Sequence, residues 1–142
     1  MRNLLLTGLV LLSLSACNNG EEPISKAKKP MAVYAISKAE FENKVSRIVP
    51  FENISLSKFA QMNVDESETT TLTFVITNPE VDVQNDSLLA IKSTMIKEAI
   101  KEEVSNIDDY NNYGVSFKKL ITTSKDLEKV YEVSYIYSNE SE

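Results

Sequence analysis

The spacing of apolar and polar side chains predicts two amphipathic helices in the part of the chain after residue 30. The first helix begins at Ser37, because Ser37 and Glu40 have the spacing of a capping box, and it ends before Pro50. The second is longer and runs from a cap at Asn85 or Asp86 to about Ile107. The apolar faces of the two helices are formed by Phe41, Val45, Ile48 and Val49, and by Leu89, Ile96, Ala99, Ile100, Val104 and Ile107, the latter flanked by Leu88, Ile91 and Met95.

Period-two alternation predicts two β-hairpins between and after these helices. Residues 54–64 alternate except at 58 and 59, and a helix over residues 55–62 fits nearly as well. Residues 65–68 have the composition of a polar turn, and residues 70–78 form a strand rich in β-branched side chains. The second hairpin is expected over residues 113–121 and 131–137, joined by residues 122–126.

The element order is therefore α-β-β-α-β-β, which is typical of the α+β class. We expect a two-layer fold with a four-stranded, mostly antiparallel sheet and both helices on one face. The order of the strands within the sheet stays open. The opposite face of the sheet, which includes Thr71, Thr73 and Thr77, would be left to solvent or to a partner.

The first residues have a different pattern, with Arg2 followed by an apolar run from Leu4 to Leu14. This run is shorter than the roughly 20 residues that a membrane-spanning helix requires. It ends in Leu14-Ser15-Ala16-Cys17, which resembles the lipobox of bacterial lipoproteins. The resemblance implies that the chain is cut before Cys17, and that Cys17 carries the lipid that attaches the protein to a membrane.

The lipobox divides the chain into a signal peptide of residues 1–16, a lipidated flexible tether of residues 17–30, and a single small α+β domain of residues 31–142. By the same resemblance, Asn18 favours the outer membrane, because an aspartate after the cysteine commonly marks retention in the inner membrane. Glu21 and Glu22 are similar to the acidic tags that direct some lipoproteins to the cell surface. The expected location is thus the outer membrane, facing the periplasm or the exterior.

Composition and charge exclude several kinds of chemistry. The formal net charge of −6 disfavours binding to nucleic acid, whose phosphates would repel the protein. The chain has no histidine, which removes the Ser-His-Asp triad and the usual zinc site. Residues 109–114 begin like a calcium loop, but Leu120 stands where the chelating glutamate belongs. We therefore expect no metal, no cofactor and no enzymatic activity.

The candidate binding residues lie in a turn-rich loop and on the open sheet face. In the loop, Tyr110 and Tyr113 are expected to be partly exposed, and Asn111, Asn112 and Gly114 to accommodate left-handed backbone. Three further tyrosines suit ligand stacking, but their strand periodicity favours a place in the core: Tyr131, Tyr135 and Tyr137. The predicted binding surface is the open sheet face or the loop from Asp108 to Gly114.

The sequence thus predicts a cell-envelope lipoprotein with a non-catalytic binding or structural role, whose partner is an envelope protein or a glycan. One alternative is a small envelope hydrolase that cleaves glycan with carboxylates and tyrosines. That chemistry would need two carboxyl groups within roughly 5–10 Å of each other in a cleft. Another alternative is an inhibitor or immunity-type protein that masks a partner.

Overall fold

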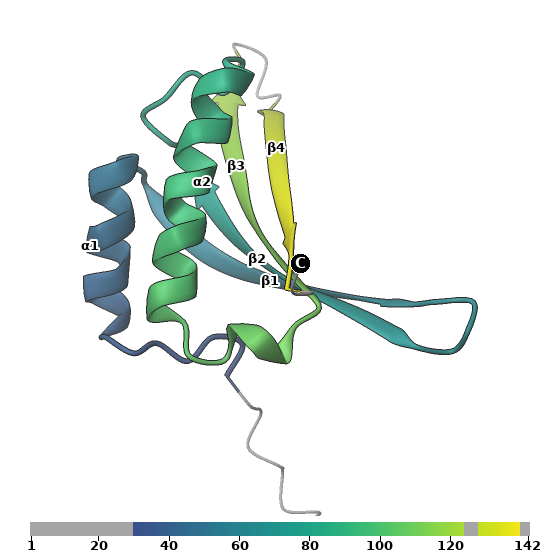
Figure 1. The fold of residues 1–142 in the computed structure, drawn as a ribbon. Coiled ribbons are helices and arrows are strands. Elements are labelled where there is room, and N and C mark those ends of the chain that lie inside the picture. Colours follow the sequence, from purple (N-terminus) through teal and green to yellow (C-terminus); the bar gives the residue numbers. More distant parts are fainter. Residues whose placement is uncertain (1–29, 124–127, 140–142) are drawn as a thin grey trace, which may run out of the picture.

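A computed structural model describes residues 30–123 and 128–139, and it confirms the α+β class (Figure 1). The predicted lipobox, signal peptide and most of the tether lie outside the described residues. The elements follow one another in the predicted order, with an additional short 3-10 helix, η1, after the second α-helix. Their bounds are α1 Lys38–Ile48, β1 Asn53–Met62, β2 Glu68–Thr77, α2 Asp86–Glu103, η1 Ile107–Asp109, β3 Asn112–Thr122 and β4 Glu128–Ser138.

The sheet has four strands in the order β1-β2-β3-β4, and it is mixed. Each hairpin is antiparallel, but the two central strands β2 and β3 pair in parallel. The expectation of a mostly antiparallel sheet therefore misses the central pairing. A parallel neighbour requires a crossover that returns the chain to the end where it started, and α2 supplies that crossover between β2 and β3.

The sequence left open whether residues 54–64 form a strand or a helix, and the structure has a strand, β1, over Asn53–Met62. β1 pairs with β2 at ten consecutive positions, from Asn53 opposite Thr77 to Met62 opposite Glu68. Residues 58 and 59 interrupt the alternation, yet they remain within the sheet, because their partners on β2, Leu72 and Thr71, also pair with β3. Phe59 lies on the same face of β1 as Ser57 and Gln61, and its side chain is 62% exposed.

The helix termini follow local rules at one end and tertiary contacts at the other. The capping box of α1 is present, with the Glu40 amide donating to Ser37 Oγ and the Ser37 amide donating to the Glu40 carboxylate. The second helix is capped by Asn85, as predicted, but it ends at Glu103 and not near Ile107. The chain leaves the helix at Val104 because this residue forms a β-bridge with Tyr34. Ile91 and Met95, expected to flank the buried face, are exposed.

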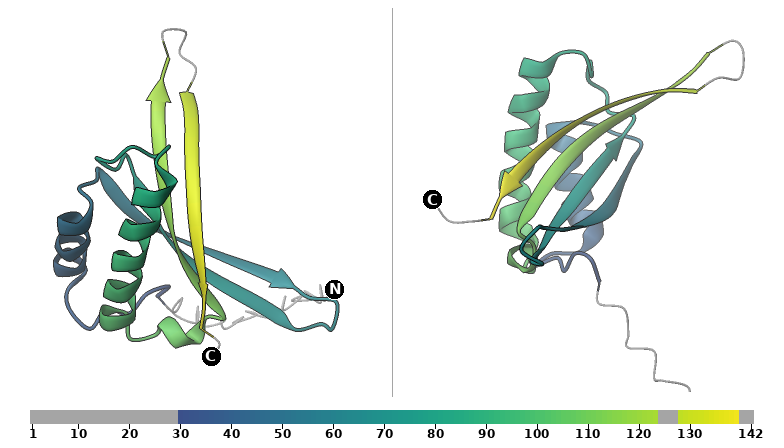
Figure 2. Two further views of the ribbon diagram at one scale, coloured as in Figure 1. Left: turned by 45° about the horizontal axis from the view of Figure 1, so that its top comes forward. Right: turned by 90° about the vertical axis from the view of Figure 1, so that its right-hand side faces the viewer.

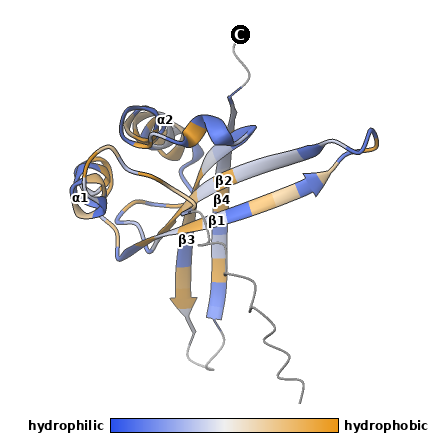
Figure 3. Ribbon diagram, turned by 90° about the horizontal axis from the view of Figure 1, so that it is seen from below, coloured by the Kyte–Doolittle hydropathy of each residue, from blue (hydrophilic) through white to orange (hydrophobic). Residues whose placement is uncertain are grey.

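The hydrophobic core lies between the helices and the inner face of the sheet. The rings of Phe41 on α1 and Phe74 on β2 are 5.6 Å apart, and Ser93 on α2 is hydrogen-bonded to Tyr137 on β4. Figure 3 draws α1 and α2 next to each other on the same side of the sheet. Tyr135 and Tyr137 pack against the core, as their periodicity predicted, whereas Tyr131 is exposed. The largest fully buried side chains are Tyr113, Phe41, Phe74, Phe117, Leu72, Ile76, Leu89, Ile96 and Ile100.

Both hairpins continue past this core as two-stranded arms that diverge from each other (Figure 2). We call residues 59–71 of the β1–β2 hairpin, outward from the last row that is shared with β3, the first arm; its turn contains Glu66, which has a positive φ of 64°. Across the described residues, no helix has the length and apolar character needed to cross a membrane.

Gly114 serves close packing and not a left-handed turn, which corrects the prediction for this residue. It lies within β3 opposite Ile136, and no described glycine has a positive φ. A Cβ atom at this position would lie 2.5 Å from Ile136 Cδ1 and 2.8 Å from the Tyr135 carbonyl oxygen. Only a residue without a side chain therefore allows β4 to lie at this distance.

We expect Gly114→Ala to lower the free energy of unfolding by about 1–3 kcal/mol, because the methyl group forces β3 and β4 apart. Denaturant unfolding followed by circular dichroism measures this change. The double variant Gly114→Ala/Ile136→Ala should recover part of the loss, since it removes one of the two close contacts. Ser134→Ala, an exposed change on the same face of β4, is the matched control. Equal stabilities of Gly114→Ala and the control would contradict the packing role.

Candidate functional site

The two tyrosines of the loop that was predicted to bind a ligand are buried. Tyr110 is 8% exposed and Tyr113 is 0% exposed, so the expectation of partial exposure is wrong. The Tyr110 hydroxyl donates a hydrogen bond to the Met31 carbonyl oxygen at 2.7 Å. Tyr113 faces the core, where its ring centroid is 5.7 Å from that of Tyr137. Both rings therefore stabilise the domain and are not displayed to a partner.

The asparagines of the loop connect it to the base of the first arm. Asn111 Oδ1 accepts hydrogen bonds from the Thr70 amide at 2.8 Å and from the Thr70 hydroxyl at 3.1 Å. Asn112 is the first residue of β3 and lies opposite Thr71 on one side and Ser138 on the other. The loop thus fixes where the arm leaves the body of the domain.

The outer face of the sheet brings the remaining candidate residues together. Thr71, Thr73 and Thr77 are half-buried on β2, and the register places Asn112 beside Thr71. In the same layer, Ser116 is fully buried and donates to Glu132 Oε1 at 2.7 Å. The structure therefore joins the threonines with Asn112 in one hydroxyl-rich strip, and it separates them from Tyr110 and Tyr113.

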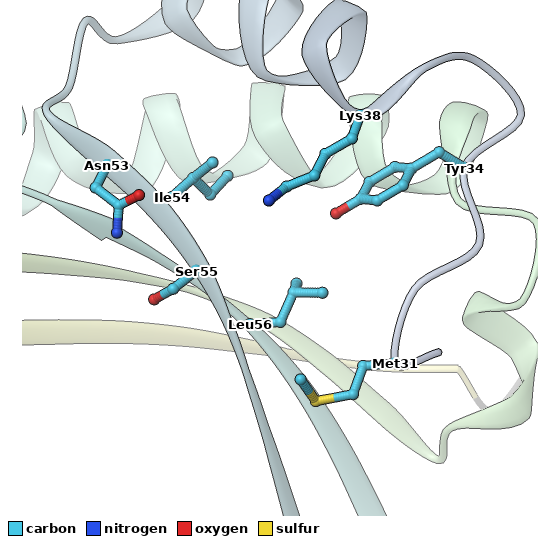
Figure 4. Close-up of a pocket in the computed structure, with 7 residues that line it drawn as sticks. All are labelled: Met31, Tyr34, Lys38, Asn53, Ile54, Ser55 and Leu56. Atoms are coloured by element: carbon cyan, nitrogen blue, oxygen red, sulfur yellow. The ribbon is translucent and has the colours of Figure 1, made fainter. Parts of the chain in front are cut away.

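A pocket that the sequence did not reveal lies beside the free edge of β1 (Figure 4). It has a volume of about 310 Å³, and one wall is the root of β1 while the other is the segment before α1. No local motif could have indicated it, because its two walls meet only when the sheet and the helix pack together. Its lining consists of Met31, Tyr34, Lys38, Asn53, Ile54, Ser55 and Leu56.

The pocket combines apolar side chains with a single cation. Among its lining residues only Lys38 is charged, and its ammonium group lies 3.4 Å from Glu42. Burial, followed by the negative charge of Glu42, raises the pKa of the Tyr34 hydroxyl above its ordinary value. Tyr34 therefore remains a neutral hydrogen-bond donor at physiological pH. The pocket suits an apolar group that arrives together with a carboxylate or another hydrogen-bond acceptor.

A shallow groove on α1 contains an ionic contact that holds the two helices together. Lys44, one of its lining residues, forms ion pairs with Glu102 and Glu103 at the end of α2. These two hydrogen-bonded carboxylates, Glu102 first, raise the pKa of Lys44. Because the charges are already paired with each other, we assign this groove a structural role.

Tyr113 and Tyr137, whose rings are in contact, lie beside α2. Lys97 Nζ lies 4.9 Å from the ring centroid of Tyr137, whose hydroxyl is hydrogen-bonded to Ser93. Burial, with smaller contributions from Glu98, Tyr137 and Asp108, raises the pKa of Tyr113 to about 12. Within residues 30–123 and 128–139, no three Cys, Asp or Glu side chains gather in a group that could hold a metal ion.

Tyr113 makes the stability of the domain sensitive to high pH. Its pKa rises from 10.0 in the unfolded chain to about 12 in the folded protein, so its contribution is fully present below pH 10 and is lost as the pH rises toward 12. We expect Tyr113→Phe to reduce this loss, as measured by urea unfolding at several pH values between 8 and 12.

The same variant should be at least as stable as the wild type at pH 7, because no described residue accepts or donates a hydrogen bond at the Tyr113 hydroxyl. Tyr131→Phe, which removes the hydroxyl of an exposed tyrosine, is the matched control. Identical high-pH profiles for Tyr113→Phe and the wild type would refute the assignment.

Comparison of this chain with known proteins found no relative. No model of a protein family, no curated protein and no solved structure matches it. The functional interpretation therefore rests on the residues and the geometry described above.

Proposed function

We propose that this chain is a lipoprotein of the bacterial cell envelope, anchored through Cys17, with a non-catalytic binding role. The observation that carries the anchor is the order of residues Leu14-Ser15-Ala16-Cys17 after a short apolar run. A single acyl chain holds a protein only reversibly, whereas several chains on one residue make release negligible. The partner expected of this surface is an envelope protein or a glycan.

The packing of the domain supports a tether that ends at residue 30. Among the described residues, contacts of the segment before α1 with the loop after α2 include those of Met31, whose carbonyl oxygen accepts from the Tyr110 hydroxyl, and of Val33, whose amide donates to Asn106 Oδ1 at 2.7 Å. Residues 18–30 would then span up to ~40–45 Å if fully extended. A domain on such a tether can meet partners that lie well above the membrane surface.

Two features of the sheet support binding as the role of the domain. In this proposal the two helices form one layer on the inner face, and the outer face with its threonine strip is left open. The pocket beside β1 adds apolar walls and one cation, Lys38, which are suited to recognition. The hydroxyl of Tyr113, whose pKa is raised to about 12, is buried and protonated, and this favours binding over catalysis.

The proposed location follows from the residues after the cysteine. Asn18 favours the outer membrane, and Glu21 and Glu22 favour display on the cell surface. The protein would face either the periplasm or the exterior from that membrane.

We expect Cys17→Ala to abolish attachment to the membrane through lipid. Mass spectrometry of the wild-type protein should show an acylated chain that begins at Cys17, and the variant should lack the acyl mass and keep its signal peptide. Asn19→Ala, two residues away, is the control and should be acylated like the wild type. A wild-type chain with an unmodified thiol would refute the proposed anchor.

We expect Asn18→Asp to move the protein from the outer to the inner membrane without changing its acylation. Separation of the two membranes on a density gradient, followed by immunoblotting, measures the distribution. The conservative change Asn18→Ser should leave most of the protein in the outer membrane. An unchanged distribution for Asn18→Asp would show that this residue does not direct sorting, while the anchor itself would stand on the previous experiment.

A further inference from the structure

The edge of the sheet at β1 lacks the features that normally keep an edge strand from pairing. Proteins protect such edges with charged residues, proline, bulges or short strands. β1 pairs with β2 at ten consecutive positions, contains neither proline nor glycine, and carries one charged residue, Lys58. No other described strand pairs with it. By contrast, the other edge strand is charged at three positions: Glu128, Lys129 and Glu132.

The first arm also displays large apolar side chains that nothing in the described chain covers. Phe59 is 62% exposed, Met62 is 68% exposed, and Val64 in the turn is fully exposed. Figure 3 shows the hydrophobic colour along this arm and at its tip. A two-stranded hairpin alone is only marginally stable in water, so the arm gains stability when it packs against another surface.

The charge of the turn helps to identify that surface. The end of the first arm carries three carboxylates, those of Asp65 and Glu66 in the turn and that of Glu68 at the start of β2. They would be repelled by the anionic head groups of a membrane. The surface that covers the arm therefore offers apolar side chains together with a cation, and the pocket beside β1 has this combination.

We propose that two copies of this chain pair through their β1 edges, antiparallel and with the two-fold axis at Phe59. In an antiparallel pair, residues at equal distances from the axis lie opposite each other on the same face of the sheet. Phe59 then meets its equivalent, and Met62 lies opposite Leu56 of the second copy. Val64 comes level with Ile54 of the second copy.

This register fills the pocket of each copy with the arm of the other. Leu56 and Ile54, which Met62 and Val64 approach, both line the pocket. The acidic turn follows directly after Val64, so its carboxylates approach Lys38 of the second copy. Because the contact is isologous, every favourable pair away from the axis occurs twice.

The single charge on β1 selects this register over its neighbour. An axis at Lys58 would place two lysine side chains directly opposite each other, which destabilises a cross-strand pair. An axis at Phe59 places Lys58 opposite Ala60 and brings two aromatic rings together at the centre. The sheets of the two copies then form one continuous sheet.

The first experiment is disulfide cross-linking of the full chain in isolated membranes. Directly opposed residues in an antiparallel pair have Cα atoms about 4.5–5.5 Å apart, within the range of a disulfide. We expect Phe59→Cys to yield at least about fivefold more covalent dimer on a non-reducing gel than Ser134→Cys, an exposed position on β4. The wild-type chain, with Cys17 as its single cysteine, gives the background.

A double variant tests the register itself. Ser57 lies opposite Gln61 of the second copy in the proposed pairing, so Ser57→Cys/Gln61→Cys should cross-link several-fold more than either single variant. Failure of Phe59→Cys to exceed Ser134→Cys, or of the double variant to exceed the single ones, would overturn the proposal.

The second experiment measures the mass of the detergent-solubilised full chain by sedimentation with correction for bound detergent. We expect two chains per particle for the wild type and one for Phe59→Glu, which places two carboxylates on the axis. Val130→Glu, an exposed apolar position on β4, should retain two chains. Circular dichroism should be the same for all three, because neither side chain lies in the core.

Two outcomes of this measurement would refute the pairing. One is a single chain per particle for the wild type at tens of micromolar protein. The other is a second, different protein that purifies with the wild type and is lost with Phe59→Glu, which would assign the β1 edge to a foreign strand. The sedimentation experiment does not depend on whether Cys17 is acylated, so failure of the pairing is distinguishable from failure of the proposed anchor.

Discussion

The parallel pairing of β2 with β3 is the constraint on which the rest of the structure depends. Two parallel neighbours can be joined only by a crossover, and this requirement places α2 against the sheet. The same pairing makes β2 and β3 the central strands, so their inner side chains are the most deeply buried of the sheet. These are Leu72, Phe74 and Ile76 on β2, and Tyr113, Val115 and Phe117 on β3.

The central pairing also explains the shape of the molecule. It extends over seven positions, from Thr71 to Thr77 on β2, whereas the two hairpins pair over ten and eleven positions. In each hairpin, the positions beyond the central pairing therefore have no neighbouring strand from the other hairpin. Since strands twist, the two excess lengths diverge as separate arms (Figure 2). Met62 and Val64, which are exposed, lie in the additional length of the first hairpin.

Local signals predicted the elements, because the interactions that specify them lie within a few residues. Ser37 and Glu40 form their capping box through contacts three residues apart, and Leu72, Phe74 and Ile76 alternate because one face of β2 is buried. The relative direction of β2 and β3 depends on contacts about 40 residues apart along the chain. Periodicity reports which face of a strand is buried and gives no information about its neighbours, so the parallel pair could not be predicted.

The position of candidate binding residues could be predicted only on β2, where buried and less buried side chains alternate regularly. Thr71, Thr73 and Thr77 lie on the outer face, as their phase indicated, because β2 alternates without interruption. Tyr110 and Tyr113 look exposed in a sequence of polar neighbours, yet they close the end of the core where α2 stops. The pocket beside β1 needs Met31 and Leu56 to meet, and no spacing rule connects residues that far apart.

The proposed anchor and the proposed pairing affect each other through concentration. The formal charge of −6 makes two copies repel each other at long range, so an edge contact between freely diffusing copies has to overcome this cost. Attachment to one membrane removes most of the translational freedom that association would otherwise restrict, and it raises the effective concentration of one β1 edge near another. The proposed pair is therefore more highly populated at the membrane than in solution. In this view the length of the tether matters, because two tethers that span up to ~40–45 Å allow the two domains to approach each other above the surface, where their edges can meet.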